Sequence, residues 1–224
     1  MANPMPQVGV HSFGSSFTQL LLIRHGESAP VVPGAPGSDD APLSDLGREQ
    51  ATKLADRLAA KHLAAVYSSP LTRAIDTARA LAQPRGLRVV VIPDLREVEL
   101  GEWAEGGFRR RAADRAPEFL AFVDGGRWEA IPGAETDDAL RARATRAIDS
   151  IVAAHPAAAV AVVCHGGFIQ AYLAAVFGMH RSLWTLIENT SVTSVLAPDG
   201  ERVVATVNDC HHLYDSALTG GPVG

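Results

Sequence analysis

The chain has 224 residues, of which 47% are hydrophobic and 20% are charged, and its formal net charge is −5. This composition supplies enough apolar side chains for a buried core and excludes a largely disordered chain. The negative charge and the absence of a long basic run argue against a nucleic-acid-binding protein, and no stretch approaches the roughly 18 apolar residues of a membrane span.

The two ends of the chain differ from its middle. The N-terminus is rich in Gly, Pro and Ser and lacks the basic and apolar stretches of a secretory signal, so we expect a flexible segment over residues 1–17. A single domain is expected over residues 18–215, followed by a flexible tail over 216–224. Two cysteines are too few for a disulfide framework and fit free thiols in a cytoplasmic protein. The sequence leaves the oligomeric state open and is compatible with a homodimer.

The first half of the chain alternates apolar runs with helical patterns. Residues 19–24 predict a buried strand, and a proline-rich loop follows over 29–42. Ser44 is expected to cap a helix with apolar residues at helical spacing. After a strand at 64–67, the pair Ser69-Pro70 is typical of an N-cap followed by proline in the first turn, which predicts a helix to about Leu81. A third strand is expected at 87–92.

The second half continues this alternation. An arginine-rich stretch at 106–126 predicts a helical insertion, and Thr136 is expected to open a helix to about residue 154. A strand at 158–163 and a helix at 166–177 follow. Two late strands, at 191–196 and 202–207, flank a Pro-Asp-Gly turn and predict a hairpin. Alternating strands and helices indicate an α/β three-layer sandwich, with a mostly parallel central sheet and helices on both faces.

Histidines follow two of these strands directly. Arg24-His25-Gly26-Glu27-Ser28 ends the first strand, and His165-Gly166-Gly167 ends the strand at 158–163. In open parallel sheets, ligands bind beyond the carboxyl ends of the strands. A neutral imidazole can act as a nucleophile toward phosphorus, and an adjacent guanidinium suits phosphate oxygens. The glycine beside His25 is expected to let a ligand approach the backbone.

Two further segments carry candidate residues. Arg73 falls in the first turn of a predicted helix just after a strand, where the helix N-terminus and the guanidinium both favour an anion. Residues 95–103 hold several carboxylates before a glycine and a tryptophan, and one of them could donate a proton to a leaving group. If this segment is extended, Glu97 and Glu99 share one face, so alternation does not separate them.

Taken in chain order, these four segments (24–28, 68–73, 95–103 and 164–167) resemble the histidine phosphatase superfamily, also called the phosphoglycerate-mutase-like family. The resemblance implies that His25 is the catalytic nucleophile and that Arg24, Arg73 and a protonated His165 hold the phosphoryl oxygens, with His165 grouped among the catalytic residues. It also implies that Glu97 is the catalytic acid, with Glu99 as the second candidate.

Ser28 is assigned to substrate binding by the same resemblance. The implied activity is metal-independent hydrolysis of a small phosphorylated metabolite through a phosphohistidine, as in histidine acid phosphatase-like enzymes, with no cofactor and no metal ligands. Nucleic acid and membranes are not expected as partners.

The sequence departs from mutase-like members of this family at three places. Val31 stands where an asparagine contributes to the phosphate site, and the segment 101–106 is one residue longer than the family's Gly-x-Trp-Glu-Gly. The cluster Arg109-Arg110-Arg111 lacks the flanking sequence of the mutase's arginine pair, and an exposed helix face explains it equally well. These departures favour a phosphatase over a phosphoglycerate mutase-type transferase.

Three rival functions compete with a histidine phosphatase. A cysteine-dependent phosphatase using Cys164 needs an arginine six residues later, where the chain has Gln170. His211 and His212 are adjacent without a Cys-x-x-Cys, which is a weak zinc pattern. A non-catalytic phospho-ligand-binding module on the same fold stays open, because fold alone does not determine function.

Overall fold

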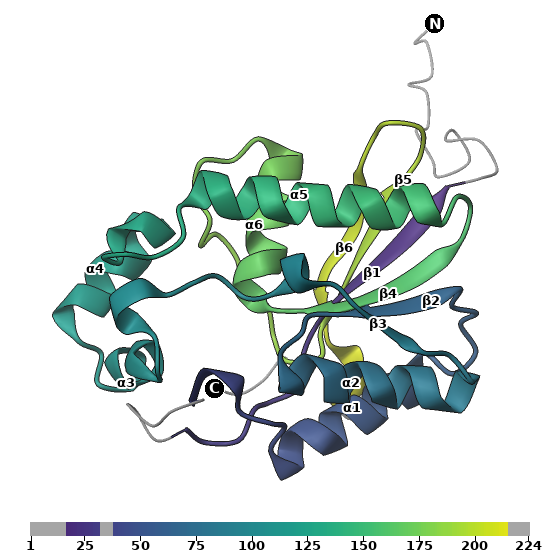
Figure 1. Ribbon diagram of the computed structural model, residues 1–224, viewed down its shortest axis with the longest axis horizontal. Helices are drawn as coiled ribbons and strands as arrows, with labels where there is room; N and C mark the ends of the chain where they lie inside the picture. The colour runs from purple at the N-terminus through teal and green to yellow at the C-terminus, as the bar shows by residue number, and fades with distance from the viewer. Residues whose placement is uncertain (1–16, 32–37, 215–224) are drawn as a thin grey trace, which may run out of the picture.

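The central feature of the computed structural model, which describes residues 17–31 and 38–214, is a six-stranded mixed sheet (Figure 1). Its strands lie in the order β3-β2-β4-β1-β5-β6. Their bounds are β1 Thr18–Arg24, β2 Ala65–Ser68, β3 Val89–Val91, β4 Ala159–Cys164, β5 Val192–Ala197 and β6 Val203–Asp209. The first four are mutually parallel, whereas β5 and β6 run antiparallel and form the predicted hairpin. Apart from Phe17, the segments predicted to be flexible lie outside the described residues.

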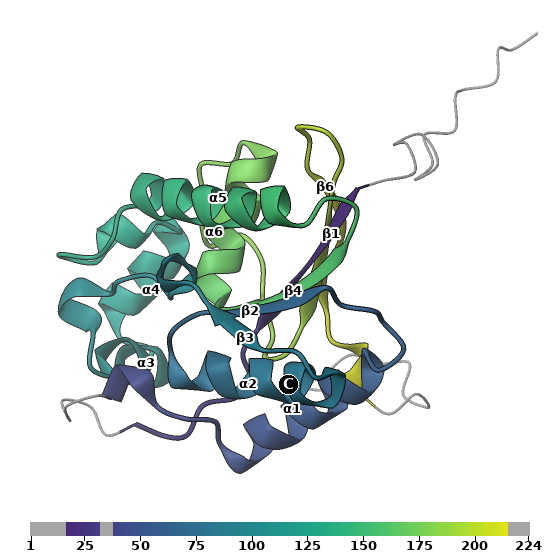
Figure 2. The ribbon, with the colours of Figure 1, turned by 45° about the vertical axis from the view of Figure 1, so that its right-hand side comes forward.

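Helices cover both faces of the sheet, which confirms the three-layer α/β prediction. On one face lie α1 (Asp45–Arg57) and α2 (Thr72–Ala82), and on the other lie α5 (Asp137–Ala154) and α6 (Gly166–Phe177), as Figures 1 and 2 both show.

Strand β1 illustrates how the sequence divides the core between these faces. Leu20 and Leu22 pack in the cluster with α5 and α6, whereas Leu21 and Ile23 pack in the cluster with α1 and α2. A strand that is buried on both faces reads as a continuous apolar run, because alternate side chains point to opposite faces.

Two of the three predicted helix caps are confirmed. The Ser44 hydroxyl accepts from the Gly47 N–H at 2.9 Å, and Thr136 caps α5 by accepting from Ala139 N–H at 3.2 Å. The prediction that Ser69 caps the next helix is wrong, because α2 begins at Thr72. The Asp40 carboxylate, from a distant loop, accepts from both the N–H and the hydroxyl of Thr72.

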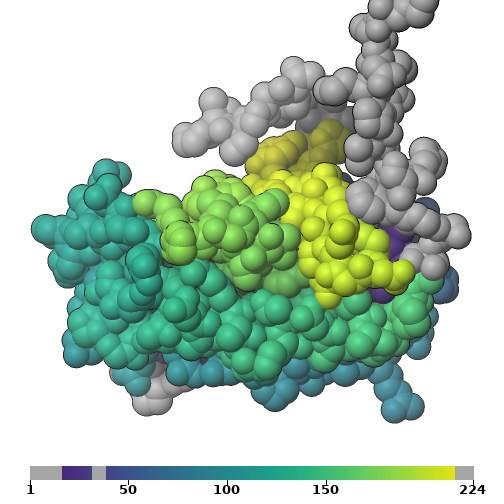
Figure 3. Space-filling view, turned by 90° about the horizontal axis from the view of Figure 1, so that it is seen from above, coloured from purple at the N-terminus to yellow at the C-terminus, as the bar shows by residue number. Residues whose placement is uncertain are grey.

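A helical insertion stands at one end of the molecule, where Figure 3 shows it as the teal region. It contains α3 (Gly107–Ala113) and α4 (Pro117–Gly125), as predicted for this arginine-rich stretch. A third apolar cluster, built around Trp103, Phe122 and Trp128, joins it to α5 and α6. Short 3₁₀ turns that the sequence did not predict occur at Ser38–Asp40, Gln83–Arg85, Pro93–Leu95, Gly101–Trp103, Trp128–Ala130 and His211–Leu213. Among the described residues, no helix has the length and apolar character needed to cross a membrane.

The Ser44 cap provides a test of local stability. Ser44→Ala should lower the free energy of unfolding by about 1 kcal/mol, because the Gly47 N–H loses its acceptor. The matched control is Thr52→Ala in the exposed middle of α1, where the change should stay within about 0.5 kcal/mol. Urea unfolding of both variants measures the difference, and equal midpoints would contradict the assigned cap.

Candidate active site

The register of the sheet places the two histidines side by side. Arg24 is paired with Cys164 at the end of the parallel β1–β4 ladder, so the next residue of each strand leaves the sheet at the same point. The rings of His25 and His165 lie edge to face with their centroids 5.0 Å apart. His25 is only 5% exposed and His165 is fully buried.

Hydrogen bonds fix the tautomer of His25. Its Nδ1 lies 2.6 Å from the Gly26 carbonyl oxygen, which only accepts, so Nδ1 carries the proton. On the other side of the ring, Arg73 Nε donates to Nε2 at 3.1 Å. Burial, and then the charges of Arg73 and Arg24, hold the pKa of His25 well below its usual value. The imidazole is therefore neutral, with its lone pair on Nε2.

Gly26 has a packing role in the loop after β1. A Cβ at this position would lie 2.6 Å from the Gly47 carbonyl oxygen, so glycine lets the loop after β1 approach the start of α1. The Gly26 N–H donates to the Thr77 hydroxyl at 3.0 Å. Asn189 Nδ2 donates to the His25 carbonyl at 2.9 Å, which anchors the same loop from the β5 side.

His165 is held in the opposite tautomer. Arg73 approaches His165 Nδ1 at 3.5 Å as a donor, so Nδ1 accepts and Nε2 donates to the Ser69 hydroxyl at 2.7 Å. The pKa of His165 is lowered well below its usual value by burial, and further by His25 and Arg73. These surroundings favour a neutral ring when no phosphoryl group is bound, and the protonated state expected for His165 with the phosphoryl group bound stays a prediction. Ser69, expected as a helix cap, instead orients this imidazole.

Two arginines, the buried Arg73 and the half-buried Arg24, lie beside the two rings. Arg73 is 6% exposed, and its Nη1 donates to the Asp39 carbonyl oxygen at 2.7 Å. Arg24 donates to the Ile187 carbonyl oxygen at 2.5 Å, while its buried Nε has no hydrogen-bond partner among the described residues. Burial is the main cause that lowers the pKa of both guanidinium groups. Within residues 17–31 and 38–214, neither arginine forms an ion pair with a carboxylate, so the cluster suits an anion.

The structure separates the two candidate acids that the sequence left on one face. Glu97 is half-buried, and its carboxylate accepts from the N–H groups of Gly167 and Phe168 at 3.3 and 3.2 Å, at the amino end of α6. Glu99 is exposed and pairs with Arg96 at 2.7 Å. A Cβ at Gly167 would lie 2.6 Å from Glu97 Oε1, so glycine is required here for the carboxylate to reach the helix.

Ser28 and Arg109 form a second contact near the site. Arg109 Nη2 donates to the Ser28 hydroxyl at 2.7 Å, and the charge of Arg109 contributes to lowering the pKa of His25. Although Arg109 is exposed, it lines the cavity described below, so a solvated helix face does not by itself account for it. The neighbouring Arg111 instead lies over the Trp103 ring, 5.2 Å from its centroid, and pairs with Glu118.

A cavity of about 460 Å³ opens beside His25. His25, Arg73 and Glu97 line its inner end. The rest is lined by other residues between 96 and 106, by Asp39, Leu71 and Trp128, and by Phe108 and Arg109 of the helical insertion. Ser28, Arg24 and His165 are not among its lining residues, so the structure places them behind or beside the cavity. Three contributors that the sequence did not predict are Ser69, Asp39 and Asn189, which act through tertiary contacts that no local motif signals.

Neither a cysteine nucleophile nor a metal centre finds support in this geometry. Cys164 is fully buried, and burial raises the pKa of its thiol, which disfavours the thiolate that cysteine chemistry requires. In the part of the chain that the structure describes, no group of three or more His, Cys, Asp or Glu side chains could hold a metal ion.

Comparison with known proteins agrees with this geometry. The histidine phosphatase superfamily (branch 1) matches residues 20–210. The metal-independent phosphoserine phosphatase of Arabidopsis thaliana is 32% identical over 89% of this chain and 84% of its own length. The glucosyl-3-phosphoglycerate phosphatase of Mycolicibacterium vanbaalenii is 35% identical over 75% of this chain and 78% of its own. The solved structure of Bacillus stearothermophilus YhfR superimposes with a TM-score of 0.75 at 31% identity, over 88% of this chain and all of that one.

The fold and the site thus define a phosphoryl-handling α/β enzyme with a buried histidine at a strand end. The chain belongs to the histidine phosphatase superfamily and is a phosphatase of that family.

The tautomer of His25 can be tested directly. Two-dimensional ¹⁵N NMR at pH 6.5 should show His25 neutral with its proton on Nδ1, because its pKa lies well below that of a free histidine. Only at lower pH should the ring protonate. The His25→Gln variant assigns the signal, and a ring that is half-protonated near pH 6.5 would contradict the described environment.

Proposed function

We propose that this chain hydrolyses phosphomonoesters in two steps through a phosphohistidine on His25 Nε2. The observation that carries the proposal is the fixed tautomer, in which Nδ1 is bound to the Gly26 carbonyl and Nε2 carries no proton, so that its lone pair can attack once the hydrogen bond from Arg73 passes to a phosphoryl oxygen. Arg73 Nε lies 3.1 Å from this nitrogen, so the same guanidinium is placed to hold an oxygen of a phosphoryl group bound there.

The first step transfers the phosphoryl group to the enzyme. Nε2 of His25 attacks phosphorus in line with the ester oxygen, the N–P bond forms and the P–O bond breaks. Glu97 donates a proton to the leaving alkoxide. Arg24 and Arg73 stabilise the charge on the equatorial oxygens, with His165 adding a hydrogen bond. Arg109 adds positive charge at the cavity, and the Ser28 hydroxyl positions Arg109 by accepting a hydrogen bond from it.

The second step releases phosphate. The Glu97 carboxylate takes a proton from water, the water oxygen attacks phosphorus, and the N–P bond breaks with return of the neutral imidazole. No step requires a metal ion, because the arginines supply the positive charge. The position of Glu97 at the amino end of α6, next to His165, supports it over Glu99, which is engaged with Arg96 at the exposed rim.

Small phosphorylated acids are the substrates for which the relatives are named, phosphoserine and glucosyl-3-phosphoglycerate among them. A mutase-type transfer is the second candidate, since phosphoglycerate mutase-like protein 4 of Arabidopsis thaliana is 32% identical over 90% of both chains. Hydrolysis is favoured here because the mutase-specific flanks of Arg109 are absent from the sequence.

Replacement of His25 tests the covalent step. His25→Ala should lower kcat by about 10³-fold or more without unfolding the protein, because it removes the nucleophile. Enzyme mixed with a radiolabelled ester and a metal chelator, then quenched in alkali, should retain label, and the variant should not. The exposed His62→Ala serves as the control and should behave as the parent protein. Near-normal turnover by folded His25→Ala, or an absolute need for a divalent metal, would overturn the mechanism.

Leaving-group dependence tests the acid. Glu97→Gln should slow the phosphorylation step about 10²-fold or more on an alkyl phosphate and little on nitrophenyl phosphate, since nitrophenolate departs without a proton. Glu99→Gln should change neither rate appreciably. Single-turnover kinetics isolates phosphorylation from hydrolysis of the intermediate. A selective loss in Glu99→Gln, with Glu97→Gln near normal, would transfer the role to Glu99.

A further inference from the structure

The cavity beside His25 is larger than a phosphoryl group requires. Its volume of about 460 Å³ falls in the range of about 300–1,000 Å³ that is typical of pockets for whole organic ligands. The phosphoryl end is accounted for by His25 and Arg73. The remainder of the cavity therefore defines where the leaving group of the ester lies.

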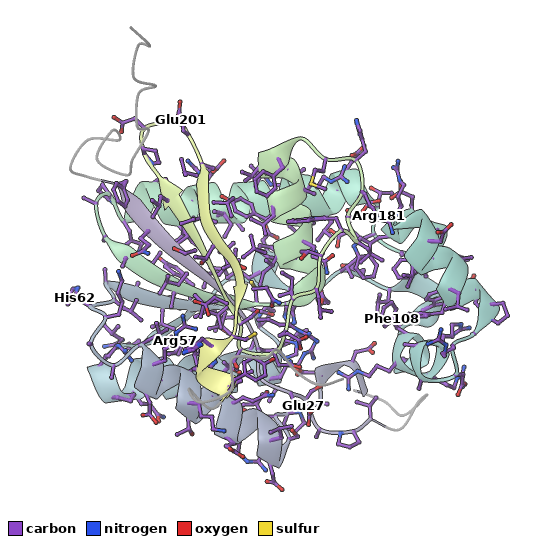
Figure 4. All side chains as sticks on the ribbon, turned by 180° about the vertical axis from the view of Figure 1, so that it is seen from behind. Glu27, Arg57, His62, Phe108, Arg181 and Glu201 are labelled. Atoms are coloured by element: carbon purple, nitrogen blue, oxygen red, sulfur yellow. The ribbon has the colours of Figure 1, made fainter. Side chains whose placement is uncertain are left out.

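This outer part of the cavity is predominantly apolar. It is lined by aromatic and aliphatic side chains from several segments: Leu71, Val98, Leu100, Trp103, Phe108 and Trp128. Figure 4 labels Phe108 in the helical insertion. A leaving group that occupied this space would replace water along an apolar wall, which is favourable for apolar surface and unfavourable for hydroxyl-rich groups.

The charged groups at the rim already have partners, whereas the buried Trp128 Nε1 in the wall has none among the described residues. Arg96 donates to Glu99 at 2.7 and 3.1 Å, and the Asp39 carboxylate accepts from the N–H groups of Glu105 and Gly106. Arg109 is assigned to the phosphoryl end of the cavity, because its charge contributes to lowering the pKa of His25, Arg24 and Arg73. Recognition of a polar leaving group by Arg96 or Asp39 would require these contacts to be exchanged.

The apolar wall is also rigid. Trp103, Phe108 and Trp128 belong to one aromatic cluster with Phe119 and Phe122, in which ring centroids lie 5.2–6.4 Å apart. Trp103 and Trp128 are each 5% exposed, and Arg111 stacks on Trp103 from another side. A preformed aromatic wall binds a flat apolar group with little loss of its own conformational freedom.

From this wall we infer that the site selects phosphomonoesters whose leaving alcohol carries a flat apolar group, such as a phenyl ring, over esters of small polar alcohols. The inference rests on the proposed function, because it assigns the leaving-group subsite of that reaction. It separates this chain from relatives named for phosphoserine and glucosyl-3-phosphoglycerate.

A binding measurement tests the subsite without relying on turnover. Quenching of tryptophan fluorescence, or calorimetry, compares 3-phenylpropylphosphonate with propylphosphonate, which are non-hydrolysable and differ only in the ring. We expect the phenyl compound to bind at least about tenfold more tightly. Phe108→Ala and Leu100→Ala, at two half-buried positions of the wall, should each remove most of this difference. Phe177→Ala, at an exposed aromatic residue that contacts Trp184, is the matched control and should retain it.

A parallel kinetic comparison uses 2-phenylethyl phosphate, ethyl phosphate and phosphoserine. The two alkyl esters have leaving groups of similar basicity, so a higher kcat/KM for the phenyl ester, by about tenfold or more, reports the subsite and not the chemistry. Equal binding of the two phosphonates, or a preference for phosphoserine in an enzyme whose turnover depends on His25, would overturn the subsite alone. Absence of His25-dependent turnover on every ester would overturn the proposed function and the substrate preference with it.

Discussion

The parallel pairing of β1 with β4 determines where each reactive group of the site can lie. Because Arg24 and Cys164 are partners in the register, His25 and His165 leave the sheet together, at the carboxyl edge where the amino ends of α2 and α6 also meet. The α2 end brings Arg73 between the two rings, and the α6 end receives the Glu97 carboxylate. A slip of one residue in this ladder would turn Arg24 and its neighbours to opposite faces and separate the histidines.

Charge is distributed unevenly around this edge. Arg73 is buried and Arg24 is half-buried, and neither has a carboxylate ion-pair partner among the described residues, an arrangement that costs free energy unless an anion offsets it. By contrast, the buried Arg143 has a carboxylate partner, because it forms an ion pair with Glu135 at 2.6 Å. Burial, together with the charges of Arg73 and Arg24, lowers the pKa of His25 and keeps it neutral. The arginines thus favour a phosphate ester and also help to preserve the lone pair that attacks it.

Part of this arrangement can be predicted from short stretches of sequence, and part of it cannot. Continuous apolar runs predict the strands that end at His25 and His165, and Ser44 and Thr136 are predictable as caps because capping depends on residues within one turn. The roles of Ser69 and Asp40 are not predictable in this way, because each depends on a residue far away in the sequence. Ser69 contacts His165, and Asp40 accepts a hydrogen bond from Thr72 at the start of α2, about thirty residues later. Likewise, the alternation of side chains along an extended segment does not separate Glu97 from Glu99. Among the three consecutive arginines 109–111, only the three-dimensional structure shows that Arg109 lines the cavity.

The stereochemistry at phosphorus tests the central claim, that His25 carries the phosphoryl group, most directly. A phosphorothioate ester made chiral at phosphorus with oxygen isotopes would be hydrolysed in isotopically labelled water, and the configuration of the released thiophosphate determined. Two successive in-line displacements, the first by His25 Nε2 and the second by water, predict overall retention of configuration. Overall inversion would mean that water attacks the ester directly, and would contradict the covalent role assigned to His25.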